Sequence, residues 1–370
     1  MDNFEKLGLH KDFIKGLNDL NIITPTPIQA EVIPLLLKSD TDLVGQAQTG
    51  TGKTAAYGLP LLQKIDPKNE VIQGLILCPT RELGQQVAKQ LFKFTKYSHK
   101  IFTEAVYGGE KIEKQIGNLR RPTHIVVATP GRLIDLVQRK AVDLRNVKTV
   151  VLDEADEMLS MGFKKELHEI LSFLESTENK WLFSATMPHG IKEIVNNYLS
   201  PEAYRIEVSR QNAVNKNIEH QFLICEENDK LHILTQFLKS QHKNRGLIFC
   251  KTKVATQKLA KQLIAKNISA DAIHGDLLQK ERDKVMRAFK NESLQILIAT
   301  DLAARGIDVE GLAYVVHYQM PDKEEYYTHR SGRTARAGKH GISLSLVTSK
   351  EVKQIRYFEK HLNIAFKQVR

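Results

Sequence analysis

A glycine-rich stretch near the amino terminus has the residue types of a phosphate-binding loop. Residues 47–54 read Ala-Gln-Thr-Gly-Thr-Gly-Lys-Thr, follow a predicted strand and open a predicted helix. Glycines let backbone N–H groups approach phosphate oxygens, and the helix amino terminus adds its dipole. Lys53 offers a charge for the β- and γ-phosphates, and the Thr54 hydroxyl suits Mg²⁺. We therefore expect a nucleoside-triphosphate site whose loop residues are Gln48, Thr49, Gly50, Thr51, Gly52, Lys53 and Thr54.

A second candidate site is a cluster of carboxylates about 100 residues further along. Residues 150–156 read Val-Val-Leu-Asp-Glu-Ala-Asp, so an apolar strand ends in acidic residues. Mg²⁺ takes one or two carboxylates together with substrate phosphates, which suits Asp153. The neighbouring Glu154 could orient and deprotonate an attacking water. An acidic strand-to-helix turn is the alternative, but the phosphate loop upstream in the same predicted domain favours metal binding by Thr54 and Asp153.

An arginine-rich segment lies near the carboxyl terminus. Residues 329–336 read His-Arg-Ser-Gly-Arg-Thr-Ala-Arg, with three arginines in eight positions. Guanidinium groups stabilise the charge on a transferring phosphoryl group, and such an arginine finger is worth about 10³–10⁵ in rate. A patch that binds nucleic acid directly would have the same composition. The motif alone leaves both interpretations open.

The elements that position these groups alternate along the chain. Short apolar segments, typical of strands buried on both faces, are separated by longer segments with helical spacing. This alternation predicts an α/β fold with two doubly wound parallel-sheet domains. The expected strands are 42–45, 74–78, 124–128, 149–153 and 181–184, then 246–250, 270–273, 294–299, 314–317 and 343–347.

Composition and charge divide the chain at a similar place. Residues 209–217 are polar and asparagine-rich, as in a linker. We place the first domain at 1–203, the linker at 204–216 and the second domain at 217–370. Basic and acidic residues number 25 each over 1–203, but 29 and 18 over 204–370, so the net charge of +11 belongs to the second part. This asymmetry suggests a polyanionic partner, most often nucleic acid, with a solubility charge as the alternative.

Other classes of protein fit the composition poorly. Hydrophobic residues make up 42% and charged residues 26%, which excludes a wholly disordered chain. Cys78, Cys225 and Cys250 lie far apart without metal-ligand spacing, so we expect a reducing compartment. No apolar run reaches the roughly 20 residues of a membrane helix, and the amino terminus does not resemble a signal peptide.

Together these motifs resemble those of the DEAD-box RNA helicases, a family with two RecA-like domains. Residues 153–156 (Asp-Glu-Ala-Asp) have the sequence that names the family, and Ala47 is its usual residue at the head of the phosphate loop. The remaining motifs occur in the family's order, from residue 24 to residue 336, which makes the resemblance specific. They are 24–29 (Thr-Pro-Thr-Pro-Ile-Gln, the Q motif), 79–83 (Pro-Thr-Arg-Glu-Leu), 108–109 (Gly-Gly), 129–132 (Thr-Pro-Gly-Arg), 184–186 (Ser-Ala-Thr), 247–250 (Leu-Ile-Phe-Cys), 279–282, 299–308 and 329–336.

The resemblance implies a role for individual residues. Besides the phosphate loop, the nucleotide would be bound by Phe4, Thr26, Gln29 and Asp308. Of these, Gln29 would read adenine. The catalytic residues would be Lys53, Asp153, the general base Glu154, and the arginine fingers Arg333 and Arg336. RNA sugars and phosphates would be contacted by Arg81, Gly109, Thr129, Arg132 and Thr300. Hydrolysis would be coupled to unwinding by Asp156, Ser184, Thr186 and His329.

Three residues depart from the family pattern. Asn21 and Ile22 stand where the Q motif usually has a glycine and an aromatic residue, which leaves the packing of adenine open. Ser331 stands where isoleucine is commoner, and we expect little effect from it.

The resemblance also implies the activity. ATP hydrolysis stimulated by RNA would be coupled to closure of the two domains and to local unwinding of RNA duplexes, without sequence specificity. An ATP-gated RNA clamp with little turnover is the alternative, and a DNA translocase is a weaker one, against which the Asp-Glu-Ala-Asp sequence argues. We expect ATP and Mg²⁺ as cofactors, RNA as a single strand or short duplex as the partner, no membrane association, and a monomeric, cytoplasmic, bacterial protein.

Overall fold

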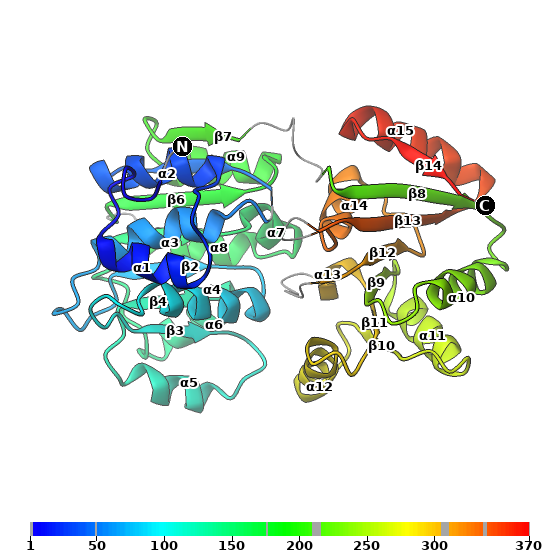
Figure 1. The fold of residues 1–370 in the computed structure, drawn as a ribbon. Coiled ribbons are helices and arrows are strands. Elements are labelled where there is room, and N and C mark those ends of the chain that lie inside the picture. Colours follow the sequence, from blue (N-terminus) through cyan, green and yellow to red (C-terminus); the bar gives the residue numbers. More distant parts are fainter. Residues whose placement is uncertain are drawn as a thin grey trace. The chain divides into compact units, whose positions relative to one another are not determined.

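The computed structural model describes residues 3–48, 50–174, 177–208, 216–304, 311–335 and 339–369. The chain forms two compact units, Met1–Ser209 and Arg210–Arg370, and each is a parallel sheet between layers of helices (Figure 1). The predicted fold class, two RecA-like α/β domains, is therefore confirmed.

The first unit is built on a seven-stranded sheet with the order β3-β4-β2-β5-β6-β1-β7, in which every pair runs parallel. The central strands β2, β4, β5 and β6 consist entirely of buried residues, as expected for strands with helices on both faces. The strands are β1 (Leu43–Gln46), β2 (Gly74–Leu77), β3 (Thr103–Val106), β4 (Ile125–Ala128), β5 (Thr149–Leu152), β6 (Asn179–Ser184) and β7 (Tyr204–Glu207).

Helices cover both faces of this sheet and create two cores. Because successive side chains of a strand point to opposite faces, Leu43 packs in one core and Val44 in the other. One face carries α1 (Lys11–Asp19), α2 (Pro27–Lys38), α3 (Lys53–Lys64) and α4 (Arg81–Phe94). The other carries α5 (Ile112–Leu119), α6 (Pro130–Gln138), α7 (Ala155–Ser160), α8 (Lys164–Ser172) and α9 (His189–Tyr198).

The second unit repeats the same architecture. Its seven-stranded parallel sheet has the order β10-β11-β9-β12-β13-β8-β14, which is the order of the first sheet when strands are counted from each unit's own first strand. The strands are β8 (Ile218–Ile224), β9 (Gly246–Phe249), β10 (Ala270–Ile273), β11 (Ile296–Ala299), β12 (Tyr314–His317), β13 (Gly341–Val347) and β14 (Phe366–Gln368). The helices are α10 (Lys230–Ser240), α11 (Lys253–Ile264), α12 (Gln279–Lys290), α13 (Asp301–Ala304), α14 (Glu324–Ser331) and α15 (Val352–Leu362), with a 3₁₀ turn at Ser349–Glu351.

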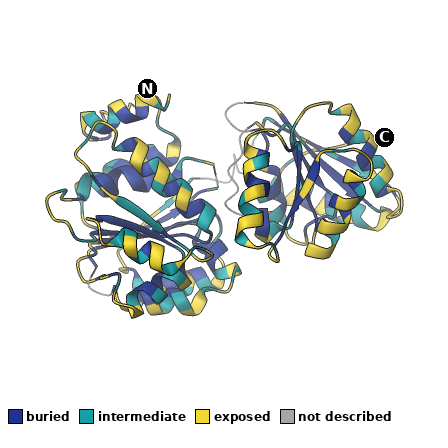
Figure 2. Ribbon diagram, turned by 90° about the horizontal axis from the view of Figure 1, so that it is seen from below, coloured by how far each residue is buried: buried dark blue, intermediate teal, exposed yellow. Residues whose placement is uncertain are grey.

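The sheets are the most buried layer of each unit, and exposed residues lie on the outward faces of the helices and in the loops (Figure 2). The carboxyl ends of the parallel strands meet at one edge of each sheet, and the predicted site residues follow several of these ends. None of the helices in the described ranges has the length and apolar character needed to cross a bilayer.

The unit boundary differs from the expected one. The sequence predicts a linker from residue 204 onward, but residues 204–207 form β7 and pair with β1. Nearly all residues of β7 are exposed, so this strand lacks the continuous apolar run that predicts most of the other strands. Backbone pairing along the edge of the sheet, rather than side-chain burial, places this strand in the first unit.

Candidate functional site

The phosphate loop connects the carboxyl end of β1 to the first residue of α3. Gly50 and Gly52 have φ angles of +86° and +91°, in the region that glycine adopts without strain. A Cβ atom on Gly52 would also lie 2.3 Å from Nε2 of Gln29, so a larger residue would displace the Gln29 amide from the loop. The Thr51 hydroxyl donates to the Gln48 carbonyl at 2.7 Å, which tightens the turn. Thr49 lies outside the described residues.

Lys53 is the first residue of α3, and its side chain folds back into the loop. The residue is 6% exposed, and Nζ donates to the Ala47 carbonyl at 3.0 Å. A neutral carbonyl satisfies one donor of the ammonium group but does not neutralise its charge. The loop therefore holds a buried cation beside backbone N–H groups at a helix amino terminus, which is an anion site by its chemistry.

The Q-motif glutamine contacts the phosphate loop directly. Gln29, in the first turn of α2, accepts a hydrogen bond from the Thr26 N–H and donates one to the Gly52 carbonyl, both at 3.0 Å. An amide has two N–H groups and two lone pairs, so one of each remains for a nucleotide. Phe4 takes no part in these contacts and is buried in the core beneath α1, α2, α3 and α4. The structure thus brings Thr26, Gln29 and the loop together.

Asp153 follows β5 and is 2% exposed. The Tyr57 hydroxyl of α3 donates to its Oδ2 at 2.8 Å, whereas its Oδ1 is buried and makes no hydrogen bond. Burial raises the pKa of Asp153, and the charge of Lys53 opposes that shift. An acceptor oxygen without a partner is costly in a buried place, so Oδ1 is suited to a ligand. Together with the Thr54 hydroxyl and bound phosphates, it fits the oxygen donors that Mg²⁺ prefers.

Glu154 has an unusual backbone conformation. Its φ and ψ are +51° and +49°, the left-handed region, directly before α7 begins. A non-glycine residue there is uncommon and costs free energy, and such residues are frequent at functional sites. The conformation turns the chain sharply after β5, so that Asp153 and Glu154 are presented at the end of the sheet.

Two of the predicted coupling segments are joined by hydrogen bonds. Oδ2 of Asp156 accepts from both the N–H and the hydroxyl of Thr186, each at 2.8 Å, and Oδ1 accepts from the Glu157 N–H at 3.1 Å. The Ser184 hydroxyl donates to the Thr186 carbonyl at 2.6 Å. The segment after β6 is therefore fastened to α7. His329, the other predicted member, lies in α14 of the second unit.

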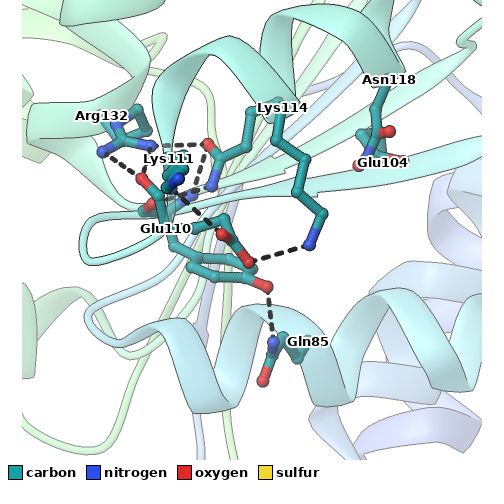
Figure 3. Close-up of polar contacts among 9 residues, drawn as sticks. Gln85, Glu104, Glu110, Lys111, Lys114, Asn118 and Arg132 are labelled. Atoms are coloured by element: carbon teal, nitrogen blue, oxygen red, sulfur yellow. Dashed lines mark hydrogen bonds and ion pairs between the residues drawn. The ribbon is translucent and has the colours of Figure 1, made fainter. Parts of the chain in front are cut away.

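A polar network that includes Glu110 and Arg132 supports the loop after β3 (Figure 3). This loop contains Gly109. The guanidinium of Arg132 donates to the Glu110 carbonyl twice at 3.1 Å and to Oε1 of Gln115 at 2.9 Å. The Gln115 side chain also accepts from the N–H of Tyr107 at 3.3 Å and donates to its carbonyl at 3.0 Å. Gln115 is 2% exposed, so its bonds hold the loop from inside the unit.

The side chain of Tyr107 links this network to α4. The guanidinium of Arg81 lies 5.1 Å from the centre of the Tyr107 ring, and Gln85 donates to its hydroxyl at 2.6 Å. Thr129 stands directly before α6, which carries Arg132. Arg81, Gly109, Thr129 and Arg132 therefore all lie at the carboxyl edge of the first sheet, after β2, β3 and β4. Thr300 has the matching place after β11 in the second unit.

The arginine-rich segment is anchored by its first arginine. Arg330 is 1% exposed and forms two bonds to Asp301, Nε to Oδ1 at 2.6 Å and Nη2 to Oδ2 at 2.7 Å. Nη1 donates to the Gln319 carbonyl at 2.8 Å. Arg330 is thus a structural residue, and Arg333 follows half-buried just beyond α14. Arg336 and Asp308 lie outside the described residues.

Ser331 is more constrained than expected from the sequence. It is fully buried, and its hydroxyl lies 2.9 Å from that of Ser343 and 3.4 Å from Nε2 of His317. The Tyr327 hydroxyl lies 3.3 Å from the Ser343 hydroxyl and 2.7 Å from Nδ1 of His220. Ser331 thus belongs to a buried polar cluster beneath α14, whereas the isoleucine that is commoner at this position would place an apolar side chain there.

Two of these positions carry no signal that sequence reasoning could use. Tyr57 and Gln115 each make contacts that orient a predicted site residue, yet neither belongs to a recognisable motif. A buried polar residue on an amphipathic helix, such as Gln115, has the same local pattern as an exposed one.

A phosphate loop after β1, an acidic pair after β5 two strands away in the same parallel sheet, and a second sheet of the same order define a two-domain RecA-like ATPase. Residues 26–194 match the DEAD/DEAH box helicase family, and residues 229–338 match the helicase conserved C-terminal domain. The chain belongs to the DEAD-box family of ATP-dependent RNA helicases.

Individual relatives agree with this assignment. The chain is 42% identical over 360 residues to the DEAD-box ATP-dependent RNA helicase CshA of Bacillus cereus, covering 97% of this chain and 68% of the relative. It is 42% identical to the ATP-dependent RNA helicase CshA of Listeria monocytogenes, covering 97% and 69%. The chain is therefore an ATP-dependent RNA helicase, and its bacterial relatives agree with the expected source.

Solved structures show the same architecture. Dbp5 of S. cerevisiae bound to RNA and ADP BeF3 has a TM-score of 0.90 and 30% identity, covering 100% of this chain and 96% of that one. Mss116p bound to ssRNA and AMP-PNP has a TM-score of 0.87 and 28% identity, covering 99% and 78%.

Proposed function

We propose that this helicase hydrolyses ATP rapidly only when nucleotide and RNA bring its two units together, and that this closure separates short RNA duplexes locally. The division of the ATPase residues between the units carries the proposal. The phosphate loop, Asp153 and Glu154 belong to the first unit, and Arg333 and Arg336 to the second. Neither unit alone holds both the loop and the arginines, so hydrolysis depends on a closed state.

In the closed state each residue has a distinct task. Lys53 and the loop N–H groups bind the phosphates, and Thr54 and Asp153 would hold Mg²⁺, which would supply further positive charge to the bound phosphates. Glu154 orients the attacking water and accepts its proton. Arg333 and Arg336 stabilise the charge on the transferring group. Gln29 reads adenine, with Phe4, Thr26 and Asp308 as further nucleotide contacts.

RNA binding follows from the residues at the carboxyl edges of the two sheets. Arg81, Gly109, Thr129, Arg132 and Thr300 contact sugar and phosphate rather than bases, so sequence preference is weak and binding falls steeply with salt. The bonds between Asp156 and Thr186 support coupling, because they tie the acidic motif to the segment after β6. Through His329 the same link reaches the second unit when the units close.

RNA and ATP favour the same closed state, so each should raise the affinity for the other by the same factor. Dbp5 and Mss116p, each solved with RNA and a nucleotide, support this view of two ligands bound to one two-domain core.

Steady-state ATPase assays with and without single-stranded RNA test the proposal. We expect strong stimulation by RNA, little by DNA of the same sequence, and loss of the stimulated rate in Glu154→Gln with ATP binding retained. RNA-independent hydrolysis would contradict the closure mechanism. Tight ATP-dependent RNA binding without turnover would instead identify an RNA clamp.

A further inference from the structure

The outward face of α15 is basic along its whole length. Ile355 and Phe358 point into the second unit and are buried. The exposed residues recur at the spacing of one helical face, over two turns. They are Lys353, Arg356, Tyr357, Lys360 and His361.

The acidic residues near this face pair with Arg356 or with backbone and hydroxyl groups, and not with its two lysines. Oε1 of Glu359 accepts from the Phe366 N–H at 2.9 Å, and its Oε2 accepts from Arg356 at 2.6 Å. Glu351 accepts from the N–H and hydroxyl of Thr348 at the start of the helix. In the part of the chain that the structure describes, Lys353 and Lys360 have no ion-pair partner.

Such a face does not stabilise the helix. Lys353 and Arg356, three apart, and Arg356 and Lys360, four apart, are like-charged neighbours, which destabilise a helix. The helix dipole favours Lys360 and His361 in the last turn but opposes Lys353 in the first. A solvated helix face more often mixes both signs of charge. The arrangement therefore points to a polyanion that supplies the missing negative charge.

An exposed aromatic pair lies between the lysines. The rings of Tyr357 and His361 stack with their centres 3.8 Å apart and an angle of 28° between their planes, and Tyr357 is 51% exposed. Aromatic rings set among basic residues are the elements of a single-strand binding surface, because the bases stack and the phosphates pair. We propose that this face of α15 is an accessory binding surface for single-stranded RNA.

This surface is separate from the predicted RNA residues of the same unit. α15 packs beside β14 at one edge of the second sheet, while β11, which precedes Thr300, lies toward the other edge (Figure 1). Five strand spacings separate β11 from β14, about 24 Å across the sheet. The inference rests on the proposed function only in taking RNA as the ligand. It predicts that strands longer than the core footprint bind more tightly than short ones.

The salt dependence of RNA binding tests the charges. We compare wild type with Lys353→Gln/Lys360→Gln, using a short and a long fluorescent single strand without ATP. For the long strand, the slope of log affinity against log salt should weaken by about 1.4, because two phosphate contacts of about 0.7 each are lost. Short-strand binding and ATPase stimulated by the short strand should be unchanged. If wild type shows no RNA-stimulated ATPase, the proposed function fails, whereas the slope tests α15 alone.

A matched variant separates this surface from general charge. In the same unit, Lys261 is exposed in the last turn of α11, and Lys266 is exposed just after this helix ends. Both lie at the end of α11 that is away from the loop between β9 and α11. Lys261→Gln/Lys266→Gln removes the same charge and should leave the long-strand slope at the wild-type value. An equal change in both double variants, or no change in either, would overturn the proposal.

Removal of the ring tests stacking independently of charge. Tyr357→Ala should lower long-strand affinity about 5-fold or more while the salt slope stays constant. Unchanged affinity would show that the ring does not stack on RNA. If the lysine variant bound RNA normally but lost binding to vesicles of anionic phospholipid, the surface would serve a membrane and the proposal would be wrong.

Discussion

The two units share one strand order and place a buried lysine at the same point of the fold. Lys53 is the first residue of α3, after β1, and Lys230 is the first residue of α10, after β8, the matching strand. Lys53 is 6% exposed and Lys230 is 1% exposed. Topology and burial are thus nearly equal, and the difference between the two lysines lies in their partners.

Lys53 donates to a neutral carbonyl, whereas Lys230 is ion-paired. Nζ of Lys230 lies 2.8 Å from Oε2 of Glu227 and 3.8 Å from Oε2 of Glu351. The segment before it, residues 225–229, contains no glycine and three acidic residues. The lysine of the phosphate loop therefore makes no ion pair among the described residues and is available to a phosphate, whereas Lys230 is paired with carboxylates as part of the fold. The comparison teaches that a shared topology places the residue but its partners decide the chemistry.

The ends of the corresponding strands β5 and β12 differ in the same way. β5 is followed by Asp153 and Glu154, while β12 ends at His317 and is followed by Tyr318. His317 is fully buried beside the hydroxyl of Ser343, where it makes a structural contact. The first unit thus presents carboxylates at this edge, and the second a neutral polar cluster.

The largest expected effect is at the lysine of the phosphate loop. Lys53→Ala should lower kcat/KM for RNA-stimulated ATP hydrolysis by about 10²-fold or more, because it removes the cation next to the transferring phosphate. Steady-state kinetics measures this. Lys64→Ala, at the far end of the same helix and paired with Asp40, should stay within about 2-fold of wild type. Near-normal activity in Lys53→Ala would contradict the assignment of the loop.

Acid should destabilise the second unit before the first. Burial lowers the pKa of His220 to about 4 and that of His317 well below its ordinary value. The unfolded chain binds these protons near pH 6.5, so the free energy of unfolding falls between pH 6.5 and 4, by up to about 3 kcal/mol for His220. Burial raises the pKa of Asp153, so the folded first unit binds a proton there at a higher pH than the unfolded chain does. This protonation stabilises the first unit as the pH falls.

Urea unfolding at pH 7 and pH 5 can separate the two units. Trp181 is the chain's single tryptophan and is buried in the first unit, so its fluorescence reports that unit alone. Circular dichroism reports both. We expect the dichroism midpoint to fall further than the fluorescence midpoint, and the difference to shrink in His220→Gln. The opposite order would show that these histidines do not control acid stability.

The ion-paired lysine should matter for stability and not for ATP. Lys230→Met should lower the free energy of unfolding of the second unit by about 2 kcal/mol, because Glu227 and Glu351 lose their shared partner. Circular dichroism in urea measures this, and ATP binding should be unchanged. Glu227→Gln, which leaves Glu351 in place, should have a smaller effect. Impaired ATP binding would mean that the two lysines are functionally alike.

The hydroxyl of Tyr57 should influence metal binding. Tyr57→Phe frees Oδ2 of Asp153, and a lost hydrogen bond of about 1 kcal/mol corresponds to about 5-fold more Mg²⁺ for half-maximal nucleotide binding. Binding of a fluorescent ATP analogue at increasing Mg²⁺ measures this without turnover. Tyr198→Phe, which removes a hydroxyl bonded to His168 on the opposite face, is the control. Equal Mg²⁺ dependence in both variants would show that Tyr57 has no positioning role.

An effect of similar size is expected at the residue that supports the loop after β3. Gln115→Leu should weaken RNA binding about 5-fold, because the backbone of Tyr107 and the guanidinium of Arg132 lose a shared partner. The salt slope and the KM for ATP should not change, since Gln115 is buried and contacts no phosphate. Fluorescence anisotropy of a labelled RNA measures the affinity and the salt slope, and steady-state kinetics measures the KM for ATP. Asn118→Ala, on the same helix and bonded to Glu104, should bind RNA normally.

Most of the fold could be predicted because its central strands carry a strong local signal. The continuous apolar runs at β2, β4, β5, β9, β11 and β12 marked buried parallel strands. Strands with weaker burial were missed, namely β3, β7, β8 and β14. The residues of β7 are nearly all exposed, and those of β8 alternate, so neither has a continuous apolar run. Only pairing with a distant strand makes them part of a sheet.

For the site, the loop at 47–54, the acidic motif at 153–156 and the arginine-rich segment could be predicted, since each is a contiguous run of residues whose chemistry is local. The sequence also indicates two domains, because the alternation of strands and helices repeats. The tertiary structure alone decided which residues orient them. Tyr57 meets Asp153 across 96 positions, and Lys230 pairs with Glu351 across the second unit. Such partners meet only because the sheet brings distant segments together, and contact between distant segments leaves no pattern in either one.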